Sequence, residues 1–376
     1  MTYKSIIFIA LLMTLFSCKP QITKEEVRPK AKNVILLIAD GTGLSQVSSA
    51  FYFKKTRPNY ARFKSIGLIR TSSAREDITD SAAGATAFST GQKTYNGAVG
   101  VAVDSTKLKT LIEILSPQHV KTGLIATSAI QHATPASFYA HVLNRGQYED
   151  IALDLVTSDV DFLAGGGRHF LNKRKDGKNL LEELKVNGFE VDTTALGSFT
   201  EIKKHSKIAY LLAEEHMNAV SKDRGDFLSN ATELGIKFLN KDPAKSSFFM
   251  MVEGSQIDWG GHDNDADYLI SELIDFDDAV GKALDFAEKD GNTLVIVTAD
   301  HETGGFTLAS TPKKKEDGTA YNDYKEITGT FSTKGHSATL IPVFAFGPGS
   351  ESFSGIYENT EIFHKIFELT SWKKEN

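Results

Sequence analysis

The chain has 376 residues, of which 41% are hydrophobic and 24% are charged, and its formal net charge is −6. This composition is typical of a soluble globular protein with one large or two medium domains. The acidic balance argues against a nucleic-acid partner, and an anionic substrate would need positive charge supplied locally by arginine or by metal ions.

The first residues have the pattern of an export signal. Lys4 gives a positive start, and an apolar run over residues 6–15 ends shortly before Cys18. This run is too short and wrongly flanked for a transmembrane helix, so we interpret residues 1–17 as a secretory signal peptide. Residues 18–32 are polar and charged and are expected to form a flexible tether.

Cys18 is the only cysteine of the chain, and it lies where a lipoprotein signal peptide would be cleaved. We therefore expect an exported periplasmic or cell-envelope lipoprotein that contacts the membrane only through a lipid on Cys18. The alternative is a plain signal peptide with an incidental cysteine. With a single cysteine, no intrachain disulfide can form.

Residues 33–376 alternate between strand-like and helix-like runs and are expected to form the main folded domain. Short apolar runs at residues 34–39, 248–252, 294–299 and 340–344 are typical of buried strands in a parallel sheet. Residues 123–126 and 161–164 are expected to form further strands. Apolar residues at helical spacing predict helices over residues 44–53, 148–158 and 263–287. The alternation predicts an α/β fold with a doubly wound, mostly parallel central sheet and helices on both faces.

Two segments interrupt this alternation. Residues 172–205 are charged and contain glycine, and we expect them to be peripheral. Residues 309–334 are expected to form an exposed insertion. The insertion would cover the active site, contact a partner subunit, or form a solvated loop.

Acidic and imidazole side chains gather next to the apolar runs: Asp40, Glu253, Asp258, His262, Asp300, His301 and His336. Because ligands collect at the carboxyl ends of parallel strands, these side chains predict a site for several metal ions and hydrolytic chemistry on an anionic substrate. Taken singly, each could be a surface histidine, a satisfied core residue or a helix cap. That interpretation is kept for the other histidines: His119, His141, His169, His205, His216 and His364.

A serine opens a run of small residues in the segment 80–91. The small side chains of residues 82–87 predict a helix that packs close to the sheet. Ser81 would lie at the helix N-terminus, where free backbone N–H groups favour an anion. The alternative is an ordinary N-cap serine. Metal coordination would supply the activation that a serine hydroxyl lacks at neutral pH.

Six blocks of the chain resemble the alkaline phosphatases, in the family's order: IADGTG (38–43), DSAAGATAFSTGQKTYNGAVG (80–100), QHATPASFYAHVLNR (131–145), EGSQIDWGGH (253–262), TADHETGG (298–305) and the glycine-histidine pair at 335–336. The resemblance extends from about Asn33 to Phe367. It implies hydrolysis of small phosphate monoesters through a phosphoserine intermediate on Ser81, two zinc ions, one magnesium ion and a homodimer.

The resemblance also distributes the ligands over three metal sites: Asp258, His262 and His336 for the first zinc; Asp40, Asp300, His301 and Ser81 for the second; Asp40, Glu253 and Thr134 for magnesium. Mixed nitrogen and carboxylate donors suit catalytic zinc, and three oxygen donors suit magnesium. Asp258 and His262 are one helical turn apart, and we expect Gly260 and Gly261 between them to let the backbone bend.

Four further side chains are expected beside the metal ligands. Arg145 resembles the phosphate-binding arginine of the family, and Asp80 directly precedes the nucleophile. His132 stands where an aspartate is usual, and Trp259 where a lysine is usual. We expect these two residues to let zinc or cobalt compete at the third site, to weaken phosphate binding and to increase the dependence on added magnesium.

Parts of this pattern also fit proteins of other classes. The glycine run at residues 165–167 before Arg168 lacks the lysine and hydroxyl of a nucleotide loop and is interpreted as a tight turn. A phosphodiesterase or sulfatase could use the same metal core. A phosphate-binding lipoprotein could use Arg145 and the helix N-terminus, but it would have no need for Ser81 beside metal ions.

Overall fold

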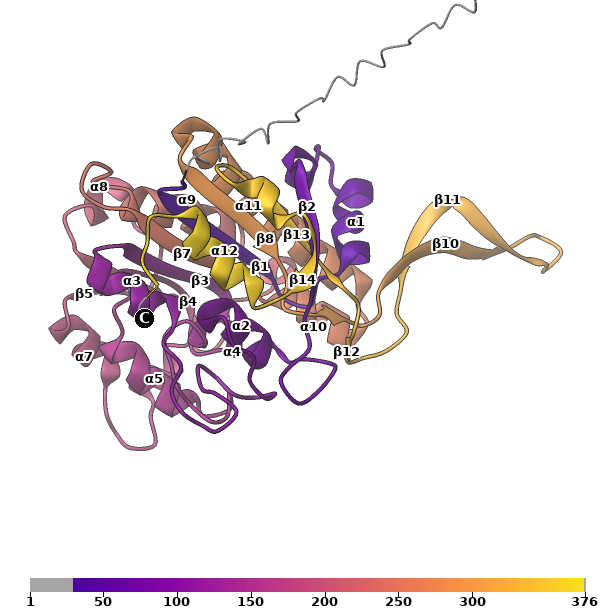
Figure 1. Ribbon diagram of the computed structural model, residues 1–376. Coiled ribbons are helices and arrows are strands. Elements are labelled where there is room, and N and C mark those ends of the chain that lie inside the picture. The colour runs from indigo at the N-terminus through magenta and orange to yellow at the C-terminus, as the bar shows by residue number, and fades with distance from the viewer. Residues whose placement is uncertain (1–29, 375–376) are drawn as a thin grey trace, which may run out of the picture.

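A computed structural model describes residues 30–374, so the predicted signal peptide, Cys18 and all but the last residues of the predicted tether lie outside the described part (Figure 1). A ten-stranded sheet forms its centre, from these strands: β1 Asn33–Ala39, β2 Ser65–Arg70, β3 Lys121–Ala129, β4 Phe162–Gly166, β5 Phe189–Asp192, β6 Lys207–Leu211, β7 Phe248–Gly254, β8 Thr293–Thr298, β13 Ile341–Phe346 and β14 Gly355–Glu358.

The strand order is β14-β2-β13-β8-β1-β7-β3-β4-β6-β5. Only β13 runs against its neighbours β2 and β8, and the other pairs are parallel. The predicted mostly parallel sheet is therefore confirmed. Four further strands lie outside it: β9 Glu302–Thr303, β10 Thr307–Lys314, β11 Ala320–Thr330 and β12 His336–Ser337.

Helices complete the fold: α1 Leu44–Phe53, α2 Ser81–Thr90, α3 Leu111–Leu115, α4 Ala133–Ala136, α5 Tyr148–Thr157, α6 His169–Asn172, α7 Leu180–Val186, α8 Phe199–Ile202, α9 Phe227–Leu239, α10 Gln256–Asp263, α11 Ala266–Asp290 and α12 Glu361–Leu369. Single turns of 3-10 helix lie at Asn59–Arg62, Ser116–Gln118, Val220–Lys222 and Ser350–Phe353. The helix predicted over residues 44–53 has these bounds in the structure, and α5 differs from its prediction by one residue at its end.

Successive residues of the central strands enter two different cores, as expected for strands buried on both faces. In β8, Leu294 and Ile296 belong to one core, and Val295 and Val297 belong to the other. The first core is closed by α2, α3, α5, α7 and α12, and the second by α1, α9 and α11. The helices therefore cover both faces of the sheet, as predicted (Figure 1).

The carboxyl ends of β1, β7 and β8 meet at one edge of the sheet because these strands are parallel neighbours. The antiparallel strand β13 begins at the same edge, because it runs in the opposite direction along β8. This explains why His336 precedes its apolar run in the sequence, while Asp40 and Asp300 follow theirs. All three arrive at the same end of the sheet.

The two predicted interruptions are both structured. Residues 172–205 contribute α7, α8 and the strand β5, which pairs with β6 as the last strand of the sheet, so the segment is peripheral as expected. The insertion predicted at residues 309–334 is a hairpin of β10 and β11, with a register shift at Ser310. It projects from the domain in Figure 1, and its base contacts α1 and α11.

The two ends of the described chain meet beside the sheet. The Ala31 amide donates to Leu369 O at 2.7 Å, and the Lys32 amide donates to Asn292 O at 2.8 Å. Hydrogen bonding to the domain thus begins slightly before the expected boundary at Asn33. No helix within residues 30–374 combines the length and apolar character needed to cross a bilayer.

The helix predicted over residues 263–287 is shorter at its start than expected. α10 continues to Asp263, and Asn264 then adopts a left-handed conformation with φ of 55°. The Asp265 side chain accepts a hydrogen bond from the Tyr268 amide at 3.0 Å and caps a new helix, α11. Periodicity alone could not show this break, because the apolar stripe resumes on the far side of the cap.

We expect Asp265→Ala to lower the free energy of unfolding by about 1 kcal/mol, because it removes the acceptor for a helix-terminal N–H group. Chemical denaturation of the purified protein measures this change. Asp265→Asn is the matched control, since it also removes the charge but keeps a capping oxygen. An equal loss in both variants would show that the charge, and not the cap, stabilises the start of α11.

Candidate active site

Every acidic and imidazole side chain predicted from the strand ends lies at the carboxyl edge of the sheet. Three groups of potential ligand atoms within 4.8 Å of one another are present among the described residues: Asp258 with His301 and His336; Asp40 with Asp300 and His301; Asp40 with His132 and Glu253. Asp40 and His301 each belong to two groups, so the three clusters form one continuous centre.

The first cluster also contains His262, as predicted. Oδ1 of Asp258 lies 3.4 Å from Nε2 of His262 and 3.8 Å from Nε2 of His336. The two Nε2 atoms are 3.1 Å apart. The ring of His301 stacks on that of His336 with centroids 3.5 Å apart, which places His301 between the first and second clusters.

The orientation of these imidazoles favours a cation. Nδ1 of His262 is 2.6 Å from Lys334 O, and Nδ1 of His336 is 2.8 Å from Thr79 O. A carbonyl oxygen can only accept, so each Nδ1 carries the hydrogen and each Nε2 presents a lone pair. Two lone pairs at 3.1 Å repel each other unless a proton or a metal ion lies between them.

Thr303 orients His301 in the same way and was not predicted. Its hydroxyl donates to Oδ1 of Asp258 at 2.5 Å and therefore accepts from Nδ1 of His301 at 3.1 Å. Nε2 of His301 is then free to face the second cluster. Thr303 lies inside the block at residues 298–305, but no feature of its sequence separates it from an ordinary strand threonine.

The glycines of α10 serve close packing and not bending, which corrects our expectation. Gly260 and Gly261 lie within a regular helix. A Cβ atom on Gly260 would come within 2.6 Å of the Leu269 backbone nitrogen, and one on Gly261 within 2.9 Å of Thr303 O. Their absent side chains let α10 approach α11 and the strand β9, which bring Asp258 and His262 to the cluster.

The second cluster contains the predicted nucleophile. Nε2 of His301 lies 3.6 Å from Oδ1 of Asp40, 3.4 Å from Oδ2 of Asp300 and 3.2 Å from Oγ of Ser81. Ser81 is the first residue of α2, and the side chain of Asp80 caps the helix by accepting from the Ala83 amide. The N-cap is therefore Asp80 and not Ser81, which leaves the serine hydroxyl free for other contacts.

The helix α2 lies very close to the end of β8, as its small residues predicted. A Cβ atom on Gly84 would come within 2.9 Å of Cβ of Asp300. This close approach brings the serine at the start of α2 to the carboxylate at the end of β8.

The third cluster, of Asp40, His132 and Glu253, contains oxygen atoms that lack partners. Both carboxylate oxygens of Asp40, Oγ1 of Thr134, Oε1 of Glu253 and Oδ2 of Asp300 are buried without a hydrogen-bond donor among the described residues. Buried polar atoms are normally satisfied, so several unsatisfied acceptors pointing at one another indicate the site of a cation. Hard oxygen donors of this kind fit magnesium.

The electrostatics of the centre agree with this assignment. Burial, reinforced by the charges of Asp300, Asp258 and Glu253, raises the pKa of Asp40 well above its usual range. Burial also raises the pKa of Glu253 to about 7 and that of Asp300 above its usual value. Burial lowers the pKa of His301 well below its usual range, so this imidazole is neutral and able to bind metal. The residues therefore fit divalent cations.

Arg145 pairs with Asp80, the residue that directly precedes Ser81. Its Nη1 donates to Oδ2 of Asp80 at 3.0 Å, and its Nη2 lies 3.4 Å from Nε2 of His132. The same Asp80 oxygen accepts from the Gly97 amide at 3.0 Å. Although burial opposes ionisation, Arg145 and the backbone N–H groups lower the pKa of Asp80, so the pair is ionic. Asp80 therefore caps α2, the helix that begins at Ser81, and orients the guanidinium of Arg145.

His132, a member of the third cluster, lies beside Trp259 and His216. We expected His216 to be a surface or satisfied core residue. The His216 ring centroid is 4.8 Å from Trp259 and 5.8 Å from His132. Nδ1 of His216 accepts from the Ala129 amide at 3.0 Å, so the residue is satisfied as expected but belongs to the wall of the site. Burial, Arg145 and His216 lower the pKa of His132 well below its usual range.

The glycine run is a turn only in its last residue. Gly165 and Gly166 belong to β4, and Gly167 has φ of 99° before Arg168 begins the approach to α6. A Cβ atom on Gly166 would lie 2.2 Å from Glu215 O. These glycines therefore serve close packing and a turn, and no phosphate loop is formed.

Comparison with known proteins gives one consistent family. A family model described as alkaline phosphatase matches residues 31–328. Alkaline phosphatase 3 of Bacillus subtilis is 35% identical and covers 93% of this chain and 91% of that protein. The alkaline phosphatase of Escherichia coli is 29% identical, over 89% of this chain and 85% of that protein.

Solved structures agree with the sequence comparison. The alkaline phosphatase of the Antarctic bacterium TAB5 superposes with a TM-score of 0.90 and 62% identity, covering 92% of this chain and 100% of that one. A variant of that enzyme with one histidine replaced by aspartate has Mg bound in its M3 site and superposes with a TM-score of 0.91.

We expect the metal-stripped protein to lose stability as the pH rises. Folding raises the pKa of Glu253 from 4.5 to about 7. A carboxyl group with a raised folded-state pKa contributes its full stability below the unfolded pKa, and this contribution is lost as the pH rises through the folded pKa. Glu253 alone should therefore lower the free energy of unfolding by about 3 kcal/mol over this window.

Thermal unfolding of chelator-treated protein at a series of pH values measures this loss. Glu253→Gln should flatten the dependence, and restored zinc and magnesium should remove it in the unmodified chain. A stripped protein whose stability rises with pH over the same window would contradict the electrostatic account of the centre.

Proposed function

The chain belongs to the alkaline phosphatase family and hydrolyses phosphate monoesters, and from that premise we propose which of its residues carry out the reaction. Ser81 is the nucleophile. The observation that carries the proposal is the position of its hydroxyl at the start of α2, 3.2 Å from Nε2 of His301 and next to the buried carboxylates of the second cluster. The substrate is a small phosphomonoester.

The reaction consists of two displacements at phosphorus. In the first, Oγ of Ser81 forms a bond to phosphorus while the ester oxygen leaves as an alcohol. In the second, water forms a bond to phosphorus while the bond to Oγ breaks, which releases inorganic phosphate and restores the serine. Splitting the reaction through a covalent intermediate is the usual gain of nucleophilic catalysis.

Three cations are proposed for the three clusters: a zinc ion held by Asp258, His262 and His336; a second held by Asp40, Asp300 and His301 next to Ser81; and magnesium held by Asp40, Thr134 and Glu253. When bound, such ions stabilise the charge of the attacking and leaving oxygens and favour the ionised serine. The fixed Nε2 lone pairs and the unsatisfied carboxylate oxygens support this distribution.

Arg145 orients the phosphoryl group during both displacements. A guanidinium can hold two nonbridging oxygens through parallel N–H donors, and Asp80 uses only one of its sides. Asp80 fixes that side to the helix that carries Ser81. Ser81 and Arg145 are therefore both positioned by Asp80, which keeps the distance between them fixed.

Assembly and location are proposed on the sequence pattern and on the family. The chain is exported through residues 1–17, is anchored through a lipid on Cys18 and acts in the periplasm or at the cell envelope as a homodimer. It uses no nucleic-acid partner, in agreement with its net charge of −6.

We expect Ser81→Ala to lower kcat by at least about 10³-fold, because the variant cannot form the covalent intermediate. Steady-state hydrolysis of an aryl phosphate measures the loss, and elemental analysis should show zinc and magnesium still bound. Ser89→Ala is the matched control: it removes a hydroxyl from the same helix, where Oγ donates to Ser137 O. Retained burst formation of phosphoenzyme in Ser81→Ala would contradict the assignment.

We expect His132→Asp to lower the magnesium concentration for half-maximal activation by about tenfold or more. The substitution replaces a neutral imidazole at the third cluster with a hard, charged oxygen donor. The TAB5 variant with aspartate in place of a histidine, which has Mg bound in its M3 site, supports this expectation.

Titration of activity with magnesium after chelation measures the effect. His119→Asp is the control, because His119 is exposed and its φ of 60° is one that aspartate tolerates. An unchanged magnesium requirement in His132→Asp would show that His132 does not limit the third site.

A further inference from the structure

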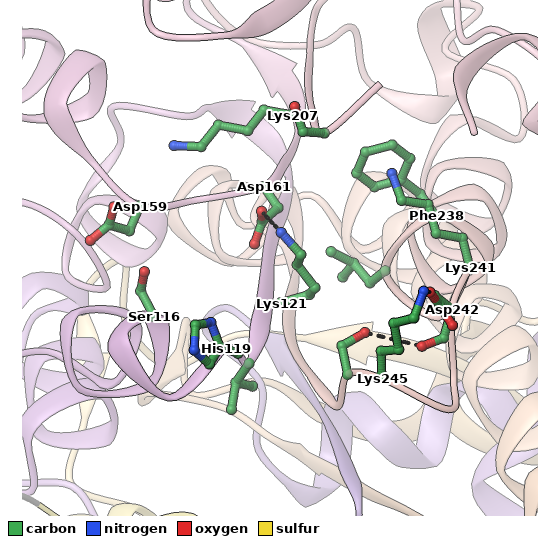
Figure 2. A pocket seen from close by; sticks show the side chains of 14 residues that line it. Ser116, His119, Lys121, Asp159, Asp161, Lys207, Phe238, Lys241, Asp242 and Lys245 are labelled. Atoms are coloured by element: carbon green, nitrogen blue, oxygen red, sulfur yellow. Dashed lines mark hydrogen bonds and ion pairs between the residues drawn. The ribbon is translucent and has the colours of Figure 1, made fainter. Parts of the chain in front are cut away.

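A lysine-lined hollow lies at the amino edge of the sheet, opposite the active site. One pocket of about 450 Å³ is lined by Lys121, Lys207, Lys241 and Lys245 (Figure 2). An adjoining pocket of about 310 Å³ shares Lys245 and adds Lys30 and Lys32. We call the two pockets together the basic hollow.

The hollow carries a positive excess in an acidic protein. Its lysines outnumber its aspartates, which are Asp159, Asp161 and Asp242. Two of these acids are already paired, Asp161 with Lys121 at 2.7 Å and Asp242 with Lys245 at 2.9 Å. Within residues 30–374, the other four lysines of the hollow form no ion pair with a carboxylate: Lys30, Lys32, Lys207 and Lys241.

Main-chain carbonyls hold three of these unpaired ammonium groups in place. Lys32 donates to Pro243 O, Lys207 donates to Ser158 O at 3.3 Å, and Lys241 donates to His205 O. A carbonyl orients an ammonium group but does not neutralise it. Burial and the charge of Lys121 lower the pKa of Lys241, a shift that a bound anion would oppose.

The basic hollow lies where the N-terminal segment joins the domain. Lys121 and Lys207 are the first residues of β3 and β6, and the described chain enters the domain at Lys30 beside the second pocket. Twenty-nine residues precede this point. Any membrane attachment through that segment would bring this edge of the domain toward the bilayer.

We propose that the basic hollow docks the domain on an anionic lipid surface through the phosphates of its headgroups, with the active site directed away from the bilayer. A net charge of −6 would otherwise repel the chain from such a surface. The lysines near the entry point attract the domain to such a surface once the separation is within a Debye length. A chain attached to the membrane through its N-terminal segment would hold this edge within that distance. The docking requires neither the phosphatase reaction nor acylation of Cys18.

The test compares full-chain variants on two kinds of vesicle, phosphatidylcholine alone and phosphatidylcholine with phosphatidylglycerol. The triple variant K32Q, K207Q and K241Q removes three unpaired charges and keeps side-chain donors. A lysine near an anionic surface contributes about 1 kcal/mol, or roughly fivefold in binding. We expect the triple variant to bind anionic vesicles at least about tenfold more weakly, and neutral vesicles unchanged.

The matched control removes the same charge from the projecting hairpin through K314Q, K315Q and K325Q. Within the described residues, these three exposed lysines form no ion pair with a carboxylate, and they lie at the other side of the domain (Figure 1). The control should bind anionic vesicles like the unmodified chain. Residues 1–29 are identical in all variants, so their contribution cancels.

Several results would overturn the proposal. One is equal loss of binding in the two triple variants, which would show an effect of net charge alone. Another is an unmodified chain that does not prefer anionic vesicles. A third is a changed sedimentation coefficient of K32Q, K207Q and K241Q without lipid, which would make the hollow a contact between copies of the chain. Hydrolysis of a soluble monoester should be the same in all variants, which separates this proposal from the catalytic one.

Discussion

The burial of several carboxylates at one end of the sheet is the constraint on which the site depends. Asp40, Glu253 and Asp300 are fully buried, and burial raises the pKa of all three. The charge of Asp300 raises the pKa of Asp40 and of Glu253 further. The nearby imidazole of His301 is neutral, and Arg145 is already paired with Asp80. Uncompensated charge of this kind strongly destabilises a folded chain, so bound cations would both complete the fold and provide the chemistry.

The topology of the sheet explains how these charged residues come together. Parallel neighbours bring Asp40, Glu253 and Asp300 to one edge without long loops, and the reversed strand β13 lets His336 arrive there from the other direction. Glycines at the helix contacts then shorten the remaining distances. Gly84 lets the serine helix touch the end of β8, and Gly261 lets α10 reach β9.

The sequence was informative where chemistry and backbone pattern coincide. Short apolar runs located the central strands, and ligand-type residues at their ends located the edge where they meet. Features set by contacts between distant segments could not be found in this way. The cap at Asp265 interrupts a helix whose apolar stripe continues, and Thr303 and His216 gain their positions only from the packing of α10 and from the turn after β6. The carbonyls that fix His262 and His336 belong to loops with no motif of their own.

A parallel sheet also keeps the side chains at the starts of its strands apart from those at the ends of its strands. The strands that end at the acidic centre begin at the opposite edge, so β1 alone places the chain's entry point about 20 Å from the end that carries Asp40. Carboxylates at one edge require cations, while lysines at the other edge retain positive charge that the domain does not neutralise. The acidic side chains therefore lie where the parallel strands end, and the lysines lie where they begin. A surface that attracts anionic lipid at the lysine edge would therefore leave the phosphatase centre open to soluble substrates, because the same strand direction sets both positions.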